Sequence, residues 1–247
     1  MAEHIFKKAS EIFNGSMYIV FEGGDGAGKD TQIELLENFI NEHLKSNKIA
    51  KKVIKTSEPG ASERGIIIRN LLLSNKYGSL SPSAELDLFM ADRREHFDKT
   101  IIPSLRSGEI IISSRGPFSS WVYQGYARGM NNDYKEYVPE GFSDYVTFRN
   151  FLATEYKKTA ILPDLCFFLN IDPELGNSRI GNKDRLESET INFRNMVRKG
   201  YHILANNYPD TIKIIDAEKN IDEINNQILS EIMPYLKKLN PKSSGSD

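Results

Sequence analysis

The glycine-rich stretch from Gly23 to Lys29 constrains the fold of this chain more than any other feature. It has the pattern G-x-x-x-x-G-K, it directly follows an apolar run, and it directly precedes a helical stripe of apolar residues. Glycines let the backbone curl so that N–H groups face inward, and the helix N-terminus adds a partial positive charge. A glycine-rich turn with a surface lysine is the alternative, but such a turn does not need four glycines at this spacing. The stretch predicts a nucleoside triphosphate site.

Strand and helix patterns alternate along the rest of the chain. Five short apolar runs are typical of buried parallel strands, and longer segments with helical periodicity separate them. This alternation predicts an α/β fold of three layers, with a five-stranded parallel sheet and helices on both faces. The expected strands lie at residues 17–24, 50–56, 108–116, 163–171 and 211–217, and the expected helices at 33–44, 62–73, 81–103, 117–126, 172–208 (broken around 181–182) and 220–236.

The composition fits one soluble domain. The chain has 247 residues, 39% of them hydrophobic and 27% charged, which is enough to bury a core. The net charge of -2 gives no basic field for nucleic acid, and no apolar run reaches the roughly 20 residues that span a bilayer. One cysteine and four histidines give neither a disulfide framework nor a zinc pattern. We therefore predict a cytoplasmic protein that binds neither nucleic acid nor membranes.

The two ends and one internal segment differ from the rest. Residues 1–16 form a helical extension in this interpretation, because the apolar residues between Ile5 and Phe13 have helical spacing. Residues 17–238 form the phosphate-loop domain, and the polar residues 239–247 form a disordered tail. The polar, tyrosine-rich segment 130–159 is either an elaborated helix pair or a partly mobile cover.

Further stretches carry residues suited to a binding site. Phe89 and Arg93 lie four residues apart and share one face of a predicted helix. Arg115 follows a predicted strand end, where ligands bind in open α/β sheets. Taken singly, Phe89 is more simply a core residue, and for Arg115 both interpretations stay open. A last stretch, more simply a solvated junction, gathers cations in a loop between helices: Arg179, Lys183 and Arg185.

Taken together, these stretches resemble the bacterial thymidylate kinases, members of the P-loop nucleoside monophosphate kinase group. The resemblance covers nearly the whole chain, and "VYQG" together with "LFMADRREH" is its most specific part. It implies a homodimeric, magnesium-dependent kinase that transfers the γ-phosphate of ATP to dTMP, giving dTDP for dTTP supply. It also implies a short lid at about residues 179–186. The other matching pieces are "FEGGDGAGKDTQ", "SEPG", "SRGPFSSWVYQGYARG", "PDLCFFLNIDPELG", "DRLE", "VRKGYHILA" and "IIDA".

The resemblance also implies roles for individual residues. Asp25 should bind the sugar 3′-hydroxyl, and Tyr123 should crowd the position of a 2′-hydroxyl. The residues implied in catalysis are Lys29, Arg115, Arg179, Lys183 and Arg185. Those implied in binding ATP are Gly23, Gly24, Asp25, Gly26, Ala27, Gly28, Lys29, Asp30, Thr31 and Ala217. Those implied in binding the acceptor are Asp25, Glu58, Phe89 (base stacking), Arg93 (a base carbonyl), Arg115 (the monophosphate), Ser119 and Gln124 (the base edge) and Tyr123.

The chain departs from the family pattern on the magnesium side of the site. Asp30 follows Lys29 where the family has a hydroxyl residue, and Ser114 precedes Arg115 where the family has Asp. We expect an exchange, in which Asp30 and Ser114 together still supply one carboxylate and one hydroxyl to Mg²⁺. The alternative is that Asp30 turns away and serves only as a favourable acidic residue in the first helical turn.

The acceptor side departs as well. Ser57 stands where an arginine usually contacts the monophosphate, with Arg69 as a candidate replacement, and Gly116 stands where the family has an aromatic residue or His. Gly26 stands where some relatives carry an arginine, so the lid should supply the cations here. These changes leave two alternatives open, a kinase of another deoxynucleotide and a regulatory nucleotide-binding protein. The intact lysine and arginines speak against the second.

Overall fold

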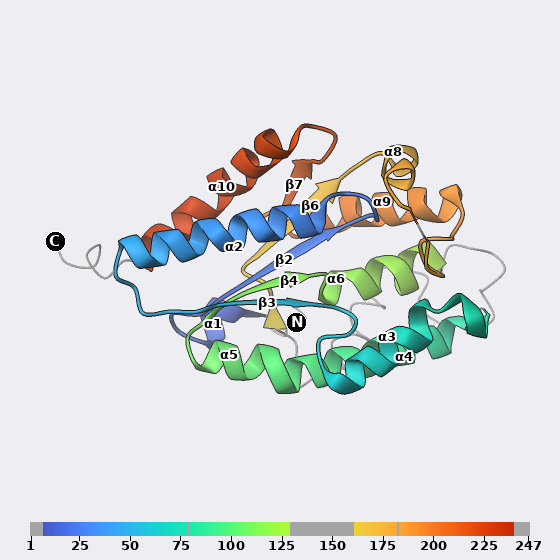
Figure 1. Cartoon of the computed structure of the whole chain (residues 1–247), viewed down its shortest axis with the longest axis horizontal. Coiled ribbons are helices and arrows are strands. Elements are labelled where there is room, and N and C mark those ends of the chain that lie inside the picture. The colour runs from blue at the N-terminus through green and yellow to red at the C-terminus, as the bar shows by residue number, and fades with distance from the viewer. Residues whose placement is uncertain (1–6, 79, 129–160, 182, 240–247) are drawn as a thin grey trace.

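A five-stranded parallel sheet forms the centre of the molecule, with the strand order β3-β4-β2-β6-β7 (Figure 1). The computed structural model describes residues 7–78, 80–128, 161–181 and 183–239. Each predicted strand is present and the α/β expectation is confirmed. The strands are β2 (Met17–Gly23), β3 (Val53–Ser57), β4 (Ile110–Ser114), β6 (Leu165–Asn170) and β7 (Ile212–Asp216).

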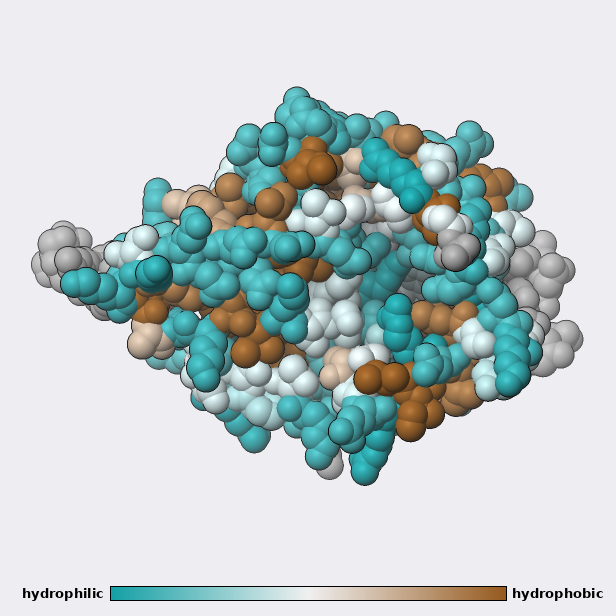
Figure 2. All heavy atoms as spheres, in the orientation of Figure 1, coloured by the Kyte–Doolittle hydropathy of each residue, from teal (hydrophilic) through white to brown (hydrophobic). Residues whose placement is uncertain are grey.

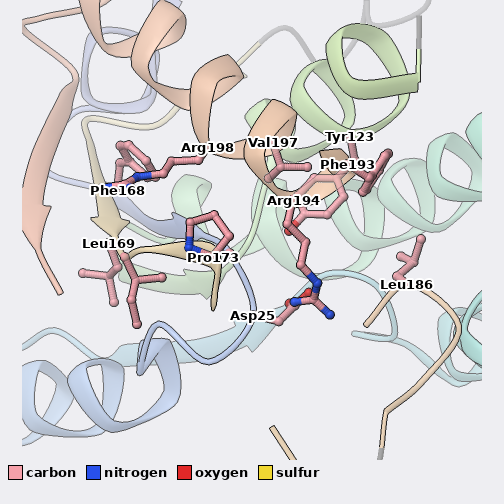
Figure 3. Close-up of a pocket in the computed structure, with 12 residues that line it drawn as sticks. Asp25, Tyr123, Phe168, Leu169, Pro173, Leu186, Phe193, Arg194, Val197 and Arg198 are labelled. Carbon is pink, nitrogen blue, oxygen red and sulfur yellow. The ribbon is translucent and has the colours of Figure 1, made fainter. Parts of the chain in front are cut away.

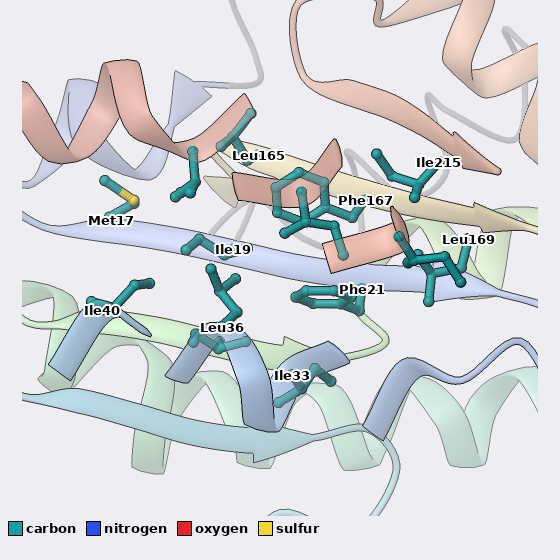
Figure 4. Packing of buried hydrophobic residues seen from close by; sticks show 14 of the residues in the cluster. Met17, Ile19, Phe21, Ile33, Leu36, Ile40, Leu165, Phe167, Leu169 and Ile215 are labelled. Atoms are coloured by element: carbon teal, nitrogen blue, oxygen red, sulfur yellow. The ribbon is translucent and has the colours of Figure 1, made fainter. Parts of the chain in front are cut away.

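Helices cover both faces of the sheet because successive side chains of each strand point to opposite sides. Ile19 and Phe21 of β2 pack against Ile33, Leu36 and Ile40 of α2 (Lys29–Ser46), as Figure 4 shows. The cluster continues to α10 (Ile221–Lys238), which shares this face. The opposite face packs against the remaining long elements: α4 (Pro82–His96), η2 (Phe97–Ile101), α5 (Ile102–Arg106), η3 (Trp121–Ala127) and α9 (Ile191–Asn207).

Two of the predicted helices contain π-helical stretches. The segment predicted at 81–103 comprises α4, η2 and α5, and the π-helical turn η2 ends two residues before Pro103. Proline has no N–H to donate, so a local change of hydrogen-bond register is expected there. The segment predicted at 117–126 begins as α6 (Pro117–Ser120) and continues as η3. The other helical elements are α3 (Glu63–Leu73), η1 (Asn75–Tyr77) and α8 (Pro173–Ser178).

The N-terminal segment differs from the predicted helix. Lys7–Lys8 form a short strand, β1, which pairs in parallel with β5 (Ile161–Leu162). The helix α1 begins only at Ala9 and ends at Ile12. The Asp164 carboxylate accepts hydrogen bonds from the backbone N–H groups of Ser10 and Tyr18, at 3.0 and 2.8 Å. The expectations for residues 1–6, 130–159 and 240–247 lie outside the described residues.

The carboxyl ends of three neighbouring strands place the site. Phe21 of β2, Ser57 of β3 and Ser114 of β4 are register partners, so the chain leaves the sheet beside the glycine-rich loop in all three cases. Figure 2 shows a hollow on this face of the molecule. Within the described residues, no helix has the length and apolar character needed to cross a membrane.

Candidate active site

The glycine-rich loop leads directly into α2. Gly28 has φ of +83° and is the N-cap of α2, so Lys29 is the first helical residue. The Lys29 Nζ donates to the carbonyl oxygens of Gly24, at 2.8 Å, and Gly23, at 3.3 Å. Burial, and then the nearby Arg115 cation, lower the pKa of Lys29 to about 8. A half-buried amine at a helix N-terminus is suited to bind phosphate.

A close backbone contact fixes the tip of the loop. Gly26 has φ of +76°, and a Cβ atom there would overlap the carbonyl oxygen of Gly176 in α8. On the other side of the contact, a Cβ on Gly176 would lie 2.7 Å from the Asp25 carbonyl oxygen. Neither glycine has room for a side chain unless α8 shifts. The contact explains in physical terms why this loop carries no arginine at position 26.

Arg115 sits at the centre of the site in a strained conformation. Its φ of +69° is rare for a residue other than glycine, and such strain persists only where the surroundings enforce it. The Arg115 N–H donates to the Phe21 carbonyl oxygen at 2.8 Å, and the Ser113 hydroxyl donates to the Arg115 carbonyl oxygen at 2.7 Å. Its guanidinium lies 2.5 Å from Asp25 and 5.0 Å from the centre of the Tyr123 ring.

A buried carboxylate, Glu22, supports the residues that follow Arg115. Its Oε1 accepts the backbone N–H groups of Gly116 and Ser119, at 3.0 and 3.1 Å. Its Oε2 accepts the hydroxyls of Ser119 and Tyr201, both at 2.6 Å. Burial raises the pKa of Glu22, and the Arg115 charge partly offsets this. The sequence analysis did not single out Glu22, since it ends an apolar strand and its partners are far away in sequence.

One cavity gathers every residue assigned to the acceptor by the resemblance. Phe89 forms part of its wall and is half-buried. Arg93 is buried at its floor and donates to Glu58 at 2.6 Å, to Ser120 at 2.7 Å and to the Gly116 carbonyl oxygen at 2.9 Å. We call this the acceptor pocket; its lining is Asp25, Glu58, Pro59, Arg69, Leu73, Phe89, Arg93, Arg115, Ser119, Ser120, Tyr123, Gln124, Asp184, Leu186 and Glu187.

The charge of Arg93 is balanced beneath the pocket. Burial alone would raise the pKa of Glu58, but Arg93 and then His96 more than offset this, so its pKa is lowered. The His96 Nδ1 lies 2.9 Å from Glu58, and the His96 Nε2 lies 2.8 Å from the Thr56 hydroxyl. Ser120, which the sequence analysis did not name, sits beside Ser119 and also lines the pocket.

A second cavity adjoins the first and holds the glycine-rich loop. We call it the phosphate cavity; its lining is Asp25, Gly26, Gly28, Lys29, Asp30, Thr31, Ser57, Glu58, Pro59, Gly60, Arg69, Ser114, Arg115, Arg179 and Glu187. Asp30 and Ser114 therefore face the same space, beside Thr31. Arg69 lines both cavities, and its Nη1 donates to the Pro59 carbonyl oxygen at 2.9 Å. Arg69 of α3 thus places a cation at both cavities, whereas Ser57 carries no charge.

The three lid cations lie in different surroundings. Arg179 lines the phosphate cavity, and its Nη1 lies 3.4 Å from the Ala217 carbonyl oxygen and 3.5 Å from that of Gly26. Lys183 donates to the side chain of Asn177 at 2.6 Å on the surface. Arg185 pairs with Glu85 of α4 at 2.7 Å and is not among the residues that line the phosphate cavity.

Two further pockets flank the site. One, drawn in Figure 3, shares Asp25, Tyr123 and Leu186 with the acceptor pocket and is walled by Phe193 and Arg194 of α9. Burial would raise the pKa of Asp25, but Arg115, Lys29 and then Arg194 more than offset it, so the carboxyl pKa is lowered. Nothing in the sequence pattern singled out Arg194. The other pocket, at the expected adenine end, is lined by Gly26, Ala27, Gly28, Thr31, Gln32, Arg179, Lys219, Asn220, Ile221, Asp222 and Ile224, while Ala217 is buried next to it.

Comparisons with known proteins identify the family. The family profile described as thymidylate kinase matches residues 21–148 and 146–228. A thymidylate kinase of Gloeobacter violaceus is 36% identical over 225 residues, covering 89% of this chain and 96% of the relative. One of Desulfovibrio desulfuricans is 32% identical and covers 90% and 97%, respectively.

A solved structure extends the likeness to three dimensions. The crystal structure of thymidylate kinase from Ehrlichia chaffeensis matches with a TM-score of 0.64 and 29% identity, covering 89% of this chain and 99% of that chain. Sequence and structure matches of this extent cover both cavities. The chain therefore belongs to the thymidylate kinase family and is an ATP-dependent kinase that converts dTMP to dTDP.

Proposed function

We propose that dTMP binds in the acceptor pocket and that the ATP phosphates bind in the phosphate cavity. The observation that carries the proposal is the shared boundary: Asp25, Arg69 and Arg115 line both cavities. A phosphoryl group passing between two bound nucleotides crosses this boundary. Phosphoryl transfer asks the protein mainly for positioning and positive charge, and two arginines stand where the two nucleotides meet.

The acceptor pocket suits a thymine nucleotide. Phe89 offers a ring for stacking, and Arg93 is held rigidly by Glu58 so that its guanidinium can face a base carbonyl. Tyr123 lies under the Arg115 guanidinium and leaves little room beside a sugar 2′ carbon. Asp25 accepts the 3′-hydroxyl in this proposal. Ser119, Ser120 and Gln124 lie toward the base edge.

The phosphate cavity supplies the charge for transfer. Lys29 and the backbone N–H groups of the loop hold the outer phosphates of ATP, and Thr31 reaches the α-phosphate. Arg115 and Arg69 hold the dTMP phosphate. Arg179 supplies the lid cation, in place of the arginine that Gly26 excludes. Lys183 remains a proposed lid cation; in the structure its side chain donates a hydrogen bond to Asn177.

The residues present fit a magnesium ion. Mg²⁺ prefers oxygen ligands and binds through one or two protein groups together with substrate phosphates. Asp30 and Ser114 both line the phosphate cavity and offer a carboxylate and a hydroxyl. We propose that these two side chains hold the ion, directly or through water. When bound, Mg²⁺ neutralises the phosphate oxygens of ATP.

The decisive experiment measures ADP release with a panel of nucleoside monophosphates. We expect dTMP to have the highest kcat/KM, followed by dUMP, because a pocket discriminates a single methyl group by only ~1–3 kcal/mol. A higher value for a purine or cytosine nucleotide would reassign the acceptor. If no member of the panel supports ADP release, the result would favour a regulatory nucleotide-binding protein.

We further propose that the enzyme is a cytoplasmic homodimer. Three aliphatic side chains of α3 are exposed, namely Ile66 (52%), Ile67 (63%) and Leu71 (41%). Brown spheres gather over α3 in Figure 2. Contiguous apolar patches of this kind mark interaction sites, and a second copy of the chain is the occupant implied by the family resemblance. Light scattering should report a dimer, and Ile67→Glu should give a monomer; a monomeric wild type would refute the proposal.

A further inference from the structure

A buried carboxylate on α4 connects the lid to the acceptor pocket. Glu85 is 1% exposed and does not line either cavity. Among the described residues its Oε1 accepts Gln124 Nε2 and Arg128 Nε, both at 2.9 Å. Its Oε2 accepts Arg128 Nη2 at 2.9 Å and Arg185 Nη2 at 2.7 Å. Burial would raise the pKa of Glu85, but Arg128 and Arg185 more than offset it, so its pKa is lowered.

Arg185 is held by several hydrogen bonds, and none of its partners in these bonds lines the phosphate cavity. Its backbone N–H donates to the Leu73 carbonyl oxygen at 3.0 Å, and its Nε donates to that of Leu72 at 2.7 Å. Nearby, the Asn75 side chain donates to the Lys183 carbonyl oxygen at 3.0 Å. The side chain of Arg185 is 11% exposed. The lid segment around Arg185 is therefore attached to the ends of α3 and α4.

The neighbours of Arg185 form one wall of the acceptor pocket. Asp184, Leu186 and Glu187 all line it, and so does Leu73, whose carbonyl receives the Arg185 backbone. Gln124, which also lines this pocket, donates to the same Glu85 carboxylate. One buried group thus sets both the position of the lid wall and the orientation of a side chain that faces the base.

We infer that Glu85 and Arg185 form an anchor that positions the lid as a wall of the dTMP pocket. The inference rests on the proposed placement of dTMP in that pocket. It gives Arg185 a different role from the one implied by the family resemblance. Arg185 acts on the binding of the monophosphate through the segment it holds, whereas Arg179 acts on the transferring group.

The test compares Arg185→Gln with Arg179→Gln. Arg185→Gln leaves Glu85 paired with Arg128 through two bonds, so the fold is retained. We expect KM for dTMP to rise about tenfold or more, the scale of one lost charge-assisted hydrogen bond, with kcat and KM for ATP nearly unchanged. Arg179→Gln should show the opposite pattern, a lower kcat with little change in KM for dTMP.

Matched controls separate anchoring from charge and from general stability. Arg64→Gln removes the same charge from an exposed pair with Glu95, also between α3 and α4, and should leave the kinetics unchanged. Arg185→Lys retains a cation for Glu85 but loses the bond to Leu72, so its KM should be intermediate. A double-mutant cycle should show that adding Arg185→Gln to Glu85→Gln raises KM little further.

A second measurement does not depend on the reaction. Amide hydrogen exchange at residues 183–189 should become faster in Arg185→Gln than in wild type, and in Arg64→Gln it should not. Faster exchange without a change in KM for dTMP would mean that Arg185 anchors the segment but that the segment does not contact dTMP. The proposed position of dTMP would then be wrong. Unchanged exchange, or a fall in kcat with KM unaltered, would overturn the anchor.

Discussion

Asp25 and Arg115 are paired across the boundary of the two cavities, with 2.5 Å between the Asp25 Oδ1 and an Arg115 guanidinium nitrogen. Asp25→Asn removes this charge pair and weakens the proposed acceptor for the sugar 3′-hydroxyl. A charge-assisted hydrogen bond contributes about 1.5–3 kcal/mol, so kcat/KM for dTMP should fall roughly 10- to 150-fold. The loss should be smaller with 3′-deoxy-dTMP as acceptor. An equal loss with both acceptors would show that Asp25 acts only through Arg115.

Tyr123 should exclude ribonucleotides. The aromatic ring lies 5.0 Å from the Arg115 guanidinium, and in the proposed binding mode it crowds the position of a 2′-hydroxyl. Tyr123→Ala should raise kcat/KM for UMP relative to dUMP. Tyr123→Phe keeps the ring and should keep the preference for the deoxy sugar. If the ratio is the same in all three proteins, another residue sets the sugar preference.

Lys29 should impose a pH limit on ATP use. Its pKa is lowered to about 8, and only its protonated form carries the charge that phosphate needs. The kcat/KM for ATP reports the free enzyme and should therefore fall as pH rises through about 8. The kcat itself should fall only at higher pH, because bound phosphates raise the pKa of the amine. The arginine in Lys29→Arg stays charged over the whole pH range. Whatever the activity of this variant, its kcat/KM for ATP should no longer fall near pH 8.

Asp30 and Ser114 should be energetically coupled. Two unit charges about 4 Å apart interact by ~4 kcal/mol at an effective dielectric of 20, so a carboxylate beside a triphosphate requires a cation. Asp30→Thr alone and Ser114→Asp alone should each lower kcat/KM and raise the Mg²⁺ concentration for half-maximal activity. The double mutant should recover much of both. Binding of Mn²⁺ with ATP, followed by electron paramagnetic resonance, should change in parallel. Purely additive losses would favour the simpler role of Asp30 as an acidic residue in the first turn of α2.

Glu22 should matter through the segment it supports. Glu22→Gln retains the size of the side chain but replaces one acceptor oxygen by a donor, opposite the hydroxyls of Ser119 and Tyr201. Those hydroxyls can turn to accept, so the fold should persist with a loss of about 1–3 kcal/mol in the free energy of unfolding. We expect kcat/KM for dTMP to fall, measured beside thermal unfolding. Glu22→Ala should unfold at a clearly lower temperature.

Most of the sheet was predictable because β2, β4 and β6 are apolar runs that end in glycine or polar residues. These strands could be predicted without tertiary information. The loop from Gly23 to Lys29 could be recognised from the strand before it and the helix after it. The strand β1 was not predictable, since two lysines show no apolar alternation. The π-helical turns η2 and η3 were missed for another reason: they change the backbone hydrogen-bond register without changing the side-chain pattern.

The site was predictable where a residue acts by its own position, and not where it acts through a distant partner. The spacing of Phe89 and Arg93 placed them on one helix face, the family resemblance gave them binding roles, and both line the acceptor pocket. Glu22 was missed because its partners lie 97 and 179 residues away. The loop that carries Arg185 was identified as basic, but its sequence could not show that this arginine faces Glu85, 100 residues away, and not the phosphates.

The backbone contact between Gly26 and Gly176 has a consequence for how this enzyme can change over generations. An arginine at position 26 would meet the carbonyl oxygen of Gly176 in α8, so a single substitution in the loop clashes with the backbone unless α8 moves as well. The helix α8 would have to move first, and that movement carries no benefit by itself. If Arg179 supplies the catalytic cation as proposed, a lineage with this contact stays dependent on its lid for that charge. An inhibitor that captures Arg179 would then leave it no single-substitution route to resistance through position 26.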